Sequence, residues 1–247
     1  MTVDVLAFGA HPDDVELGCG ATLAVLAAAG LRTGIVHLTS GEAGTRGSAE
    51  ERRDEARHAA EILGVSELRF LDCGDGALRT GVAEEDAVIA ILRELRPEVV
   101  LSPTPADRHP DHGRAHRLVA DAAFYAGLRG RATGTTSPVH RPGAVYSYMQ
   151  HDEFRPSFVL DVTAGWEKKL AALDAYGSQI HRPGRADERT EPPTKTASVD
   201  FRAAMEGRAR HYGNLAGATF GEPFWAPGPL PAGRPEALLT FVPGGVR

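Results

Sequence analysis

Residues 3–30, VDVLAFGAHPDDVELGCGATLAVLAAAG, decide the fold of this chain. Val3 to Phe8 is a short apolar run that predicts a buried strand ending at Gly9-Ala10. Val15 to Ala29 is long enough and rich enough in Ala and Leu to form a helix, and Gly30 is a suitable stop. A buried strand that passes through a polar turn into a helix begins a βαβ unit, so we expect a parallel sheet.

The same alternation of apolar runs and helical stretches continues to about residue 125. The expected strands are Gly34–Leu38, Leu68–Leu71 and Val99–Ser102, and the expected helices run from the Ser48 capping box to Leu63, from Glu84 to Leu95 and from Gly113 to Tyr125. The alternation predicts an α/β fold, a Rossmann-like three-layer sandwich with a mostly parallel central sheet and helices on both faces. Ligands of such sheets bind beyond the carboxyl ends of the strands.

Beyond residue 127 the pattern is less regular. The expected elements are a loop at 130–142, strands Ala144–Tyr148 and Phe158–Val162, and helices Trp166–Tyr176 and Phe201–Tyr212. The polar segment Gly184–Lys195 is a candidate lid or subunit contact. The Pro/Gly-rich tail Gly221–Arg234 is expected to lie extended against the body. Because we find neither an internal repeat nor a clear linker, we expect residues 1–247 to form a single domain.

Composition excludes several classes of protein. The 247 residues include 27 Lys+Arg and 33 Asp+Glu, a net charge of −6, which disfavours nucleic-acid binding. No apolar run approaches the roughly 20 residues of a membrane-spanning helix, and the N-terminus lacks the pattern of a signal peptide. Two cysteines, Cys19 and Cys73, cannot build a disulfide framework or a Cys-rich zinc site. We therefore expect a cytoplasmic protein that binds neither nucleic acid nor membrane.

The first polar cluster is Ala10-His11-Pro12-Asp13-Asp14, at the junction of the first strand and helix. His11 and Asp14 are three residues apart and could both point into one site, where an imidazole and a carboxylate suit zinc. Asp13, between them, could face a metal-bound water. Alternatively, Asp13 or Asp14 caps the helix, which is a common role for Asp at such a position.

The second polar cluster is Asp107-Arg108-His109-Pro110-Asp111-His112, after the fourth strand. His11, Asp14 and His112 would give three zinc ligands with a fourth position open, as in catalytic zinc sites. His112 and His116 are also spaced as a helical metal pair, but the Glu of a His-Glu-x-x-His helix is missing. Gly18-Cys19-Gly20 lies inside the first helix and lacks the third glycine of a nucleotide loop, so we interpret it as a packing feature.

The two clusters together, in this order and at this separation, resemble the PIG-L/LmbE family of zinc-dependent N-acetylglucosamine deacetylases. The resemblance covers about residues 3 to 215 and includes the segments GEAGTRG (41–47), ERRDEA (51–56), SFVLDV (157–162), EKKL (167–170) and AYGSQ (175–179). These segments are most similar to the branch that deacetylates N-acetylglucosaminyl-malate in bacillithiol biosynthesis.

The resemblance implies a role for each matching position. It places one Zn²⁺ per chain on His11, Asp14 and His112, in agreement with the choice made from the residues alone, and assigns the general base to Asp13. The remaining implied roles are a catalytic His109 steadied by the carboxylate of Asp111, a substrate-binding Arg52, and Phe201 in place of a tyrosine that some members use. Iron or cobalt would accept the same ligands.

The function expected from the resemblance is hydrolysis of the N-acetyl group of a small amino-sugar substrate, most similar to N-acetylglucosaminyl-malate, by an enzyme that acts on a linear amide bond. An inositol conjugate or a chitooligosaccharide is the alternative substrate. A non-catalytic sugar- or nucleotide-binding module, with both turns only as helix caps, is the alternative from another class. A phosphoesterase would need a second metal and more carboxylate ligands. Relatives in the family imply a homo-oligomer, a trimer or hexamer.

Overall fold

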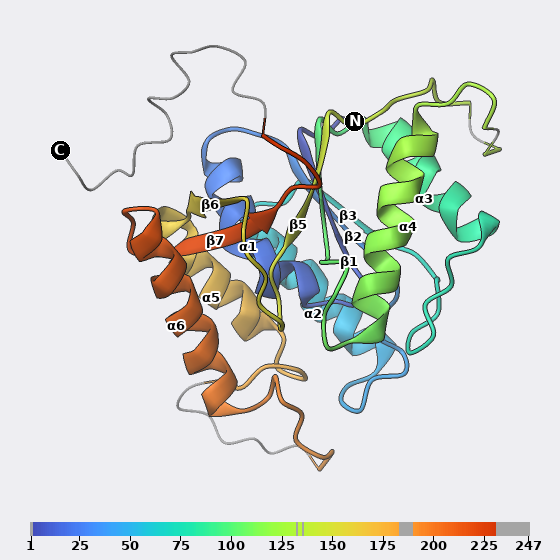
Figure 1. Ribbon diagram of the computed structural model, residues 1–247. Helices are drawn as coiled ribbons and strands as arrows, with labels where there is room; N and C mark the ends of the chain where they lie inside the picture. Colours follow the sequence, from blue (N-terminus) through green and yellow to red (C-terminus); the bar gives the residue numbers. More distant parts are fainter. Residues whose placement is uncertain (1, 132, 135, 183–189, 231–247) are drawn as a thin grey trace.

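A single mixed sheet of seven strands organises the computed structural model, which describes residues 2–131, 133–134, 136–182 and 190–230 (Figure 1). The elements are β1 (Val5–Gly9), α1 (Asp14–Ala28), β2 (Thr33–His37), α2 (Ala49–Leu63), β3 (Glu67–Phe70), α3 (Val82–Leu95), β4 (Val99–Ser102), α4 (Pro110–Ala126), β5 (Ala144–Tyr148), β6 (Phe158–Asp161), a 3₁₀ turn (Thr163–Gly165), α5 (Trp166–Ala175), α6 (Val199–Leu215) and β7 (Gly221–Trp225).

The strand order is β3-β2-β1-β4-β5-β7-β6, with β1 to β5 parallel. The chain moves outward from β1 through β2 to β3 and then returns to place β4 on the other side of β1. This reversal opens a crevice beyond the carboxyl ends of β1 and β4, where α/β sheets bind ligands. Both predicted polar turns follow these two strands.

Helices cover both faces of the sheet, which confirms the predicted three-layer α/β fold. Figure 1 shows α3 and α4 on one face and α1, α2, α5 and α6 on the other. Successive side chains of a strand point to opposite faces. Val5 and Ala7 of β1 therefore join the core under the α1 layer, whereas Leu6 and Phe8 join the core under α3 and α4.

The structure differs from the sequence-based expectation at two elements. The tail that we expected to be merely extended forms β7, an antiparallel strand between β5 and β6. Helix α4 begins at Pro110 rather than Gly113, with His109 as its N-cap, so His112 lies in its first turn. Residues 184–189 of the predicted lid or contact segment and residues 231–234 of the predicted tail lie outside the described residues.

Helix α1 is kinked at Cys19, whose φ of −144° is not helical. A Cβ on the preceding residue, Gly18, would lie 2.1 Å from the Tyr148 ring of β5. The Tyr148 hydroxyl donates to the Phe8 carbonyl oxygen at 2.9 Å, which fixes the ring against α1. Gly18 thus serves close packing, as we interpreted it, whereas a Cβ at Gly20 would come no closer than 3.6 Å to its neighbours. Among the described residues, no helix combines the length and apolar character that a membrane crossing needs.

Candidate metal and catalytic centre

The two polar turns meet in one cavity of about 310 Å³ at the carboxyl ends of the parallel strands. The turns after β1 and β4 and the loops after β2, β3 and β5 line it, together with Arg52 of α2 and with Gln179, Thr194 and Thr196 between α5 and α6. Each of these loops follows the end of a parallel strand, so segments that are distant in the sequence reach the same cavity. A site of this kind lies where the fold predicts one.

Asp14 lies between the two predicted metal-binding histidines. Its Oδ2 is 3.3 Å from His11 Nδ1, and its Oδ1 is 3.2 Å from His112 Nε2. The His11 backbone N–H donates to Oδ2 at 2.8 Å, and the Gln150 side-chain amide donates to Oδ1. The structure therefore brings together the three side chains that the sequence proposed as metal ligands, and all three are buried.

The electrostatics of this cluster favour a cation. Burial alone would lower the pKa of His112, but the carboxylates of Asp14 and Asp107 raise it to about 9. Burial opposes the charged form of His11 too, yet Asp14, Asp111 and Asp75 raise its pKa well above the usual value. Imidazole nitrogens of His11, His109 and His112 lie within 4.8 Å of one another. A position that stabilises positive charge between nitrogen and oxygen donors suits a divalent metal.

Asp13 occupies the N-cap position of α1 but makes no side-chain capping hydrogen bond. Its φ of +106° is a conformation that non-glycine residues rarely adopt and that costs about 1–3 kcal/mol. Burial raises the pKa of Asp13 to about 7, against the opposing charge of Arg52. A buried carboxyl that titrates near neutrality suits a general base, whereas the capping interpretation has no capping bond in its favour.

Arg52 joins the loops after β1 and β2. Its Nη2 donates to the Pro12 carbonyl oxygen at 2.7 Å and its Nη1 donates to the Gly41 carbonyl oxygen at 3.1 Å. Arg52 Nη2 is also 3.9 Å from Asp13 Oδ2. The side chain lines the cavity, and its Nε has no hydrogen-bond partner among the described residues. Substrate binding by Arg52 stays a prediction, to which the structure adds these contacts with the loop that carries Asp13.

His109 and Asp111 contact each other differently from what the resemblance implied. The His109 Nδ1 accepts the backbone N–H of Asp111 at 3.3 Å. The Asp111 carboxylate accepts the backbone N–H groups of Gly76 and Leu78 at 2.8 and 3.1 Å and pairs with Arg114. Residue 111 therefore fixes the His109 ring mainly through its backbone, while its carboxylate fixes the loop after β3.

Four residues of the centre were given no role from the sequence. They are Asp75, Asp107, Gln150 and His151. Asp75 and Gln150 follow β3 and β5, so their position just after a predicted strand was a usable signal. Asp107 stands in the second polar cluster, but its spacing did not show that its carboxylate faces His112.

The remaining candidates from the sequence lie around the centre or outside it. His116 Nδ1 is 3.1 Å from the Pro103 carbonyl oxygen and 3.1 Å from the Ser147 hydroxyl, so the structure does not place it with His112 as a metal pair. Phe201 is 5.7 Å from His151, ring to ring, which places it at the edge of the centre. Cys19 and Cys73 are buried free thiols.

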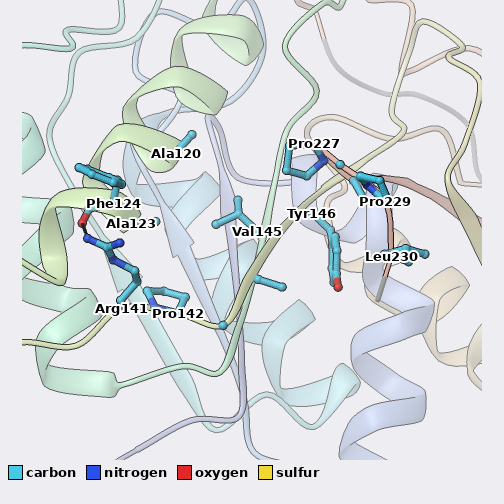
Figure 2. A pocket seen from close by; sticks show the side chains of 14 residues that line it. Ala120, Ala123, Phe124, Arg141, Pro142, Val145, Tyr146, Pro227, Pro229 and Leu230 are labelled. Atoms are coloured by element: carbon cyan, nitrogen blue, oxygen red, sulfur yellow. Dashed lines mark hydrogen bonds between the residues drawn. The ribbon is translucent and has the colours of Figure 1, made fainter. Parts of the chain in front are cut away.

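A second and larger cavity, of about 460 Å³, lies between α4, β5 and residues 226–230 (Figure 2). Phe124, Val145, Pro227 and Pro229 are among its apolar lining residues. Among the described residues that line it there is no carboxylate and no imidazole. Of these two cavities, only the smaller one is lined by carboxylates and imidazoles.

Comparison with known proteins agrees with this geometry. The family model PIG-L, described as GlcNAc-PI de-N-acetylase, matches residues 6–123, which include both polar turns. Diacetylchitobiose deacetylase of Thermococcus kodakarensis is 31% identical over 88% of this chain and 80% of its own length. 4-Oxalmesaconate hydratase of Pseudomonas putida is 33% identical over 71% of this chain and 74% of its own.

A solved structure has the same fold. A conserved protein of Thermus thermophilus superposes with a TM-score of 0.82 and 37% identity, over 93% of this chain and 97% of its own. The match therefore extends from the first strand through the less regular C-terminal half. Taken with the deacetylase relative and the family model, it shows that the chain is an enzyme that belongs to the PIG-L family of de-N-acetylases.

Proposed function

We propose that this enzyme removes the acetyl group from an N-acetylglucosaminyl conjugate, with a zinc ion held by His11, Asp14 and His112. The observation that carries the proposal is the Asp14 carboxylate between two imidazoles, beside the strained and buried Asp13. The deacetylase relative supports the reaction type and an N-acetylated sugar as substrate.

The donor set fits zinc in both type and number. Two imidazoles and one carboxylate are ordinary zinc ligands, and three protein ligands are typical of catalytic rather than structural sites. The ion would supply a water of lowered pKa and would polarise the acetyl carbonyl group. The Gln150 side-chain amide donates to the Asp14 carboxylate and would hold that metal ligand in orientation.

Residues of the chain would perform the proton transfers. Asp13 would take a proton from the attacking water, because it is a buried carboxylate beside the proposed ligands and makes no helix-capping bond. Because His109 Nδ1 accepts the Asp111 N–H, the neutral ring carries its proton on Nε2. That N–H would donate to the carbonyl oxygen as negative charge develops there. Asp13 would then pass the proton that it took from water to the leaving amine nitrogen as the C–N bond breaks, and the products would be acetate and the free amino sugar.

For the conjugate itself, we favour N-acetylglucosaminyl-malate, with an inositol conjugate or a chitooligosaccharide as the alternatives. A cavity of about 310 Å³ is at the small end of ligand sites. It accommodates the acetylated sugar and leaves the second part of the conjugate at the rim. Arg52 and Arg108 both line the cavity, and their guanidinium groups could bind an acidic part of the conjugate.

The test is release of free amine from each of the three conjugates, with metal content measured on the same sample. Asp13→Asn tolerates the positive φ of this position but cannot accept a proton. We expect it to retain zinc and to lose about 10²-fold or more of the activity. Asp54→Asn, at an exposed carboxylate of α2, is the matched control.

Two results would overturn the proposal. One is a wild-type enzyme that binds no zinc when zinc is supplied. The other is a zinc-loaded enzyme that releases no amine from any conjugate but hydrates an unsaturated dicarboxylic acid, the chemistry named for the Pseudomonas putida relative.

A further inference from the structure

We propose that Asp75 and Asp107 are positioning residues, each of which holds the outer ring nitrogen of one metal-binding histidine. The inference rests on the metal site proposed above. It concerns the two carboxylates that lie on the far sides of the His11 and His112 rings.

The two rings are oriented in opposite senses. His11 turns Nδ1 toward Asp14 and places Nε2 3.0 Å from Asp75 Oδ1. His112 turns Nε2 toward Asp14 and places Nδ1 3.4 Å from Asp107 Oδ2. Each imidazole therefore lies between the shared carboxylate and a carboxylate of its own, in the continuous row Asp75–His11–Asp14–His112–Asp107.

Asp75 is held in place by groups other than His11. Its Oδ2 accepts the backbone N–H of Ala43 at 2.8 Å, and its own N–H donates to Glu42 at 2.9 Å. These bonds connect the loops after β2 and β3 and leave Oδ1 facing the ring. Asp111 is also near the His11 Nε2, at 3.6 Å, but its oxygens already accept two backbone N–H groups.

Asp107 is the buried counterpart on the other side. Its side chain is 0% exposed, and its Oδ2 accepts the backbone N–H of His151 at 3.2 Å. A carboxylate that is withdrawn from water needs a charged or hydrogen-bonding partner. The facing His112 Nδ1, at an ion-pair distance of 3.4 Å, has no hydrogen-bond partner among the described residues and is the available cation when it is protonated.

The chemical consequence concerns the protonation of the ligands. A neutral imidazole binds a metal through its unprotonated ring nitrogen, and its proton is then on the other ring nitrogen. A carboxylate beside the outer nitrogen fixes that proton there, orients the ring and makes the inner nitrogen a stronger ligand. Removing such a partner typically weakens metal binding by about 10- to 100-fold.

The experiment measures zinc affinity by competition with a chromophoric chelator, on the full chain and without substrate. We expect Asp75→Ala and Asp107→Ala each to weaken zinc binding by about 10- to 100-fold. The zinc affinities of Asp75→Asn and Asp107→Asn should lie between those of the alanine variants and the wild type, because an amide oxygen can still accept the ring N–H but has no charge. The Co²⁺-substituted Asn variants should show a shifted visible absorption band, which a purely structural role would not produce.

The matched controls are Asp72→Ala, an exposed carboxylate in the same loop as Asp75, and Asp152→Ala, an exposed one directly after His151. Both should bind zinc as the wild type does. Zinc affinity within twofold of wild type in both Asp75→Ala and Asp107→Ala would overturn the proposal. Because no substrate is used, inactivity toward every conjugate would count against the proposed function alone.

Discussion

Glu222 and Lys169 form a buried ion pair that replaces part of the hydrogen-bond ladder of α1 at its kink. Lys169 Nζ donates to the Leu17 carbonyl oxygen at 2.8 Å, and the Glu222 carboxylate accepts the N–H groups of Ala21 and Thr22 at 3.2 and 2.8 Å. In a straight helix the Ala21 N–H would bond to the Leu17 carbonyl. The pair therefore satisfies both groups where the helix does not, and Glu222→Gln should destabilise the protein strongly.

The size of the effect follows from burial. Both side chains are 3% exposed, so Glu222→Gln leaves the Lys169 ammonium group buried without a countercharge. Breaking such a pair costs about 3–5 kcal/mol. The loss of stability in Lys169→Met should be at the lower end of this range, because the Glu222 carboxylate keeps three hydrogen-bond donors, including the Thr22 hydroxyl.

In the double variant Lys169→Met/Glu222→Gln no charge remains, and the amide oxygen introduced at position 222 still faces the N–H groups of α1. Its cost should be smaller than the sum of the two single costs by about 1–3 kcal/mol. The assay is equilibrium unfolding in urea, followed by circular dichroism at pH 7 with saturating zinc in every sample. Single variants that each lose less than about 1 kcal/mol, or costs that simply add, would refute this explanation of the kink.

Two further predictions test the surroundings of the centre. Gly41→Ala should destabilise the protein more than Gly134→Ala, although both glycines have a φ of +68°, because only at Gly41 would the new Cβ meet Arg52, 1.9 Å from Nη1. Urea unfolding of both variants measures the difference, and equal losses would contradict the steric argument. Burial lowers the pKa of His37 to about 4. An unfolded His titrates near 6.5, so stability should fall by up to about 3 kcal/mol as pH drops from 6.5 to 4. His37→Gln should flatten this pH dependence. An unchanged slope of the unfolding free energy against pH would contradict the role of His37.

The parallel half of the fold could be predicted because its signals are local. Each of the first four strands is a short apolar run with a turn or helix signal close behind it. The strand β7 could not be predicted, because Gly221 and Pro223 are residues that disfavour a strand. In the structure the pairing of β7 with β5 ends at Phe224, so Pro223 lies where one side of the strand has no pairing partner.

The site was predictable to the same extent. The ligand types and their positions after strands identified His11, Asp14 and His112. The kink of α1 could not be predicted, because it depends on side chains from a distant helix and strand. The position of Asp75 after a predicted strand was a signal, but its contact with His11 could not be predicted, because it depends on how two distant loops pack together. Glu222 lies 200 residues from Thr22, and Asp75 is one of two Asp residues in a Gly-containing loop. Their effect depends on the packing of the whole sheet and not on any pattern along the chain.

The charge balance of the centre argues against a role in helix capping alone. Five carboxylates surround it with side chains that are nearly withdrawn from water, namely Asp13, Asp14, Asp75, Asp107 and Asp111. Neighbouring buried carboxylates repel one another, so a cluster of them is unfavourable unless cations lie between them. The imidazoles occupy the places where that charge is needed, and the carboxylates beside His112 raise its pKa although burial alone would lower it. Two helix caps would need neither the buried carboxylates nor the strained backbone of Asp13, whereas a bound dication would compensate the charge of the carboxylates.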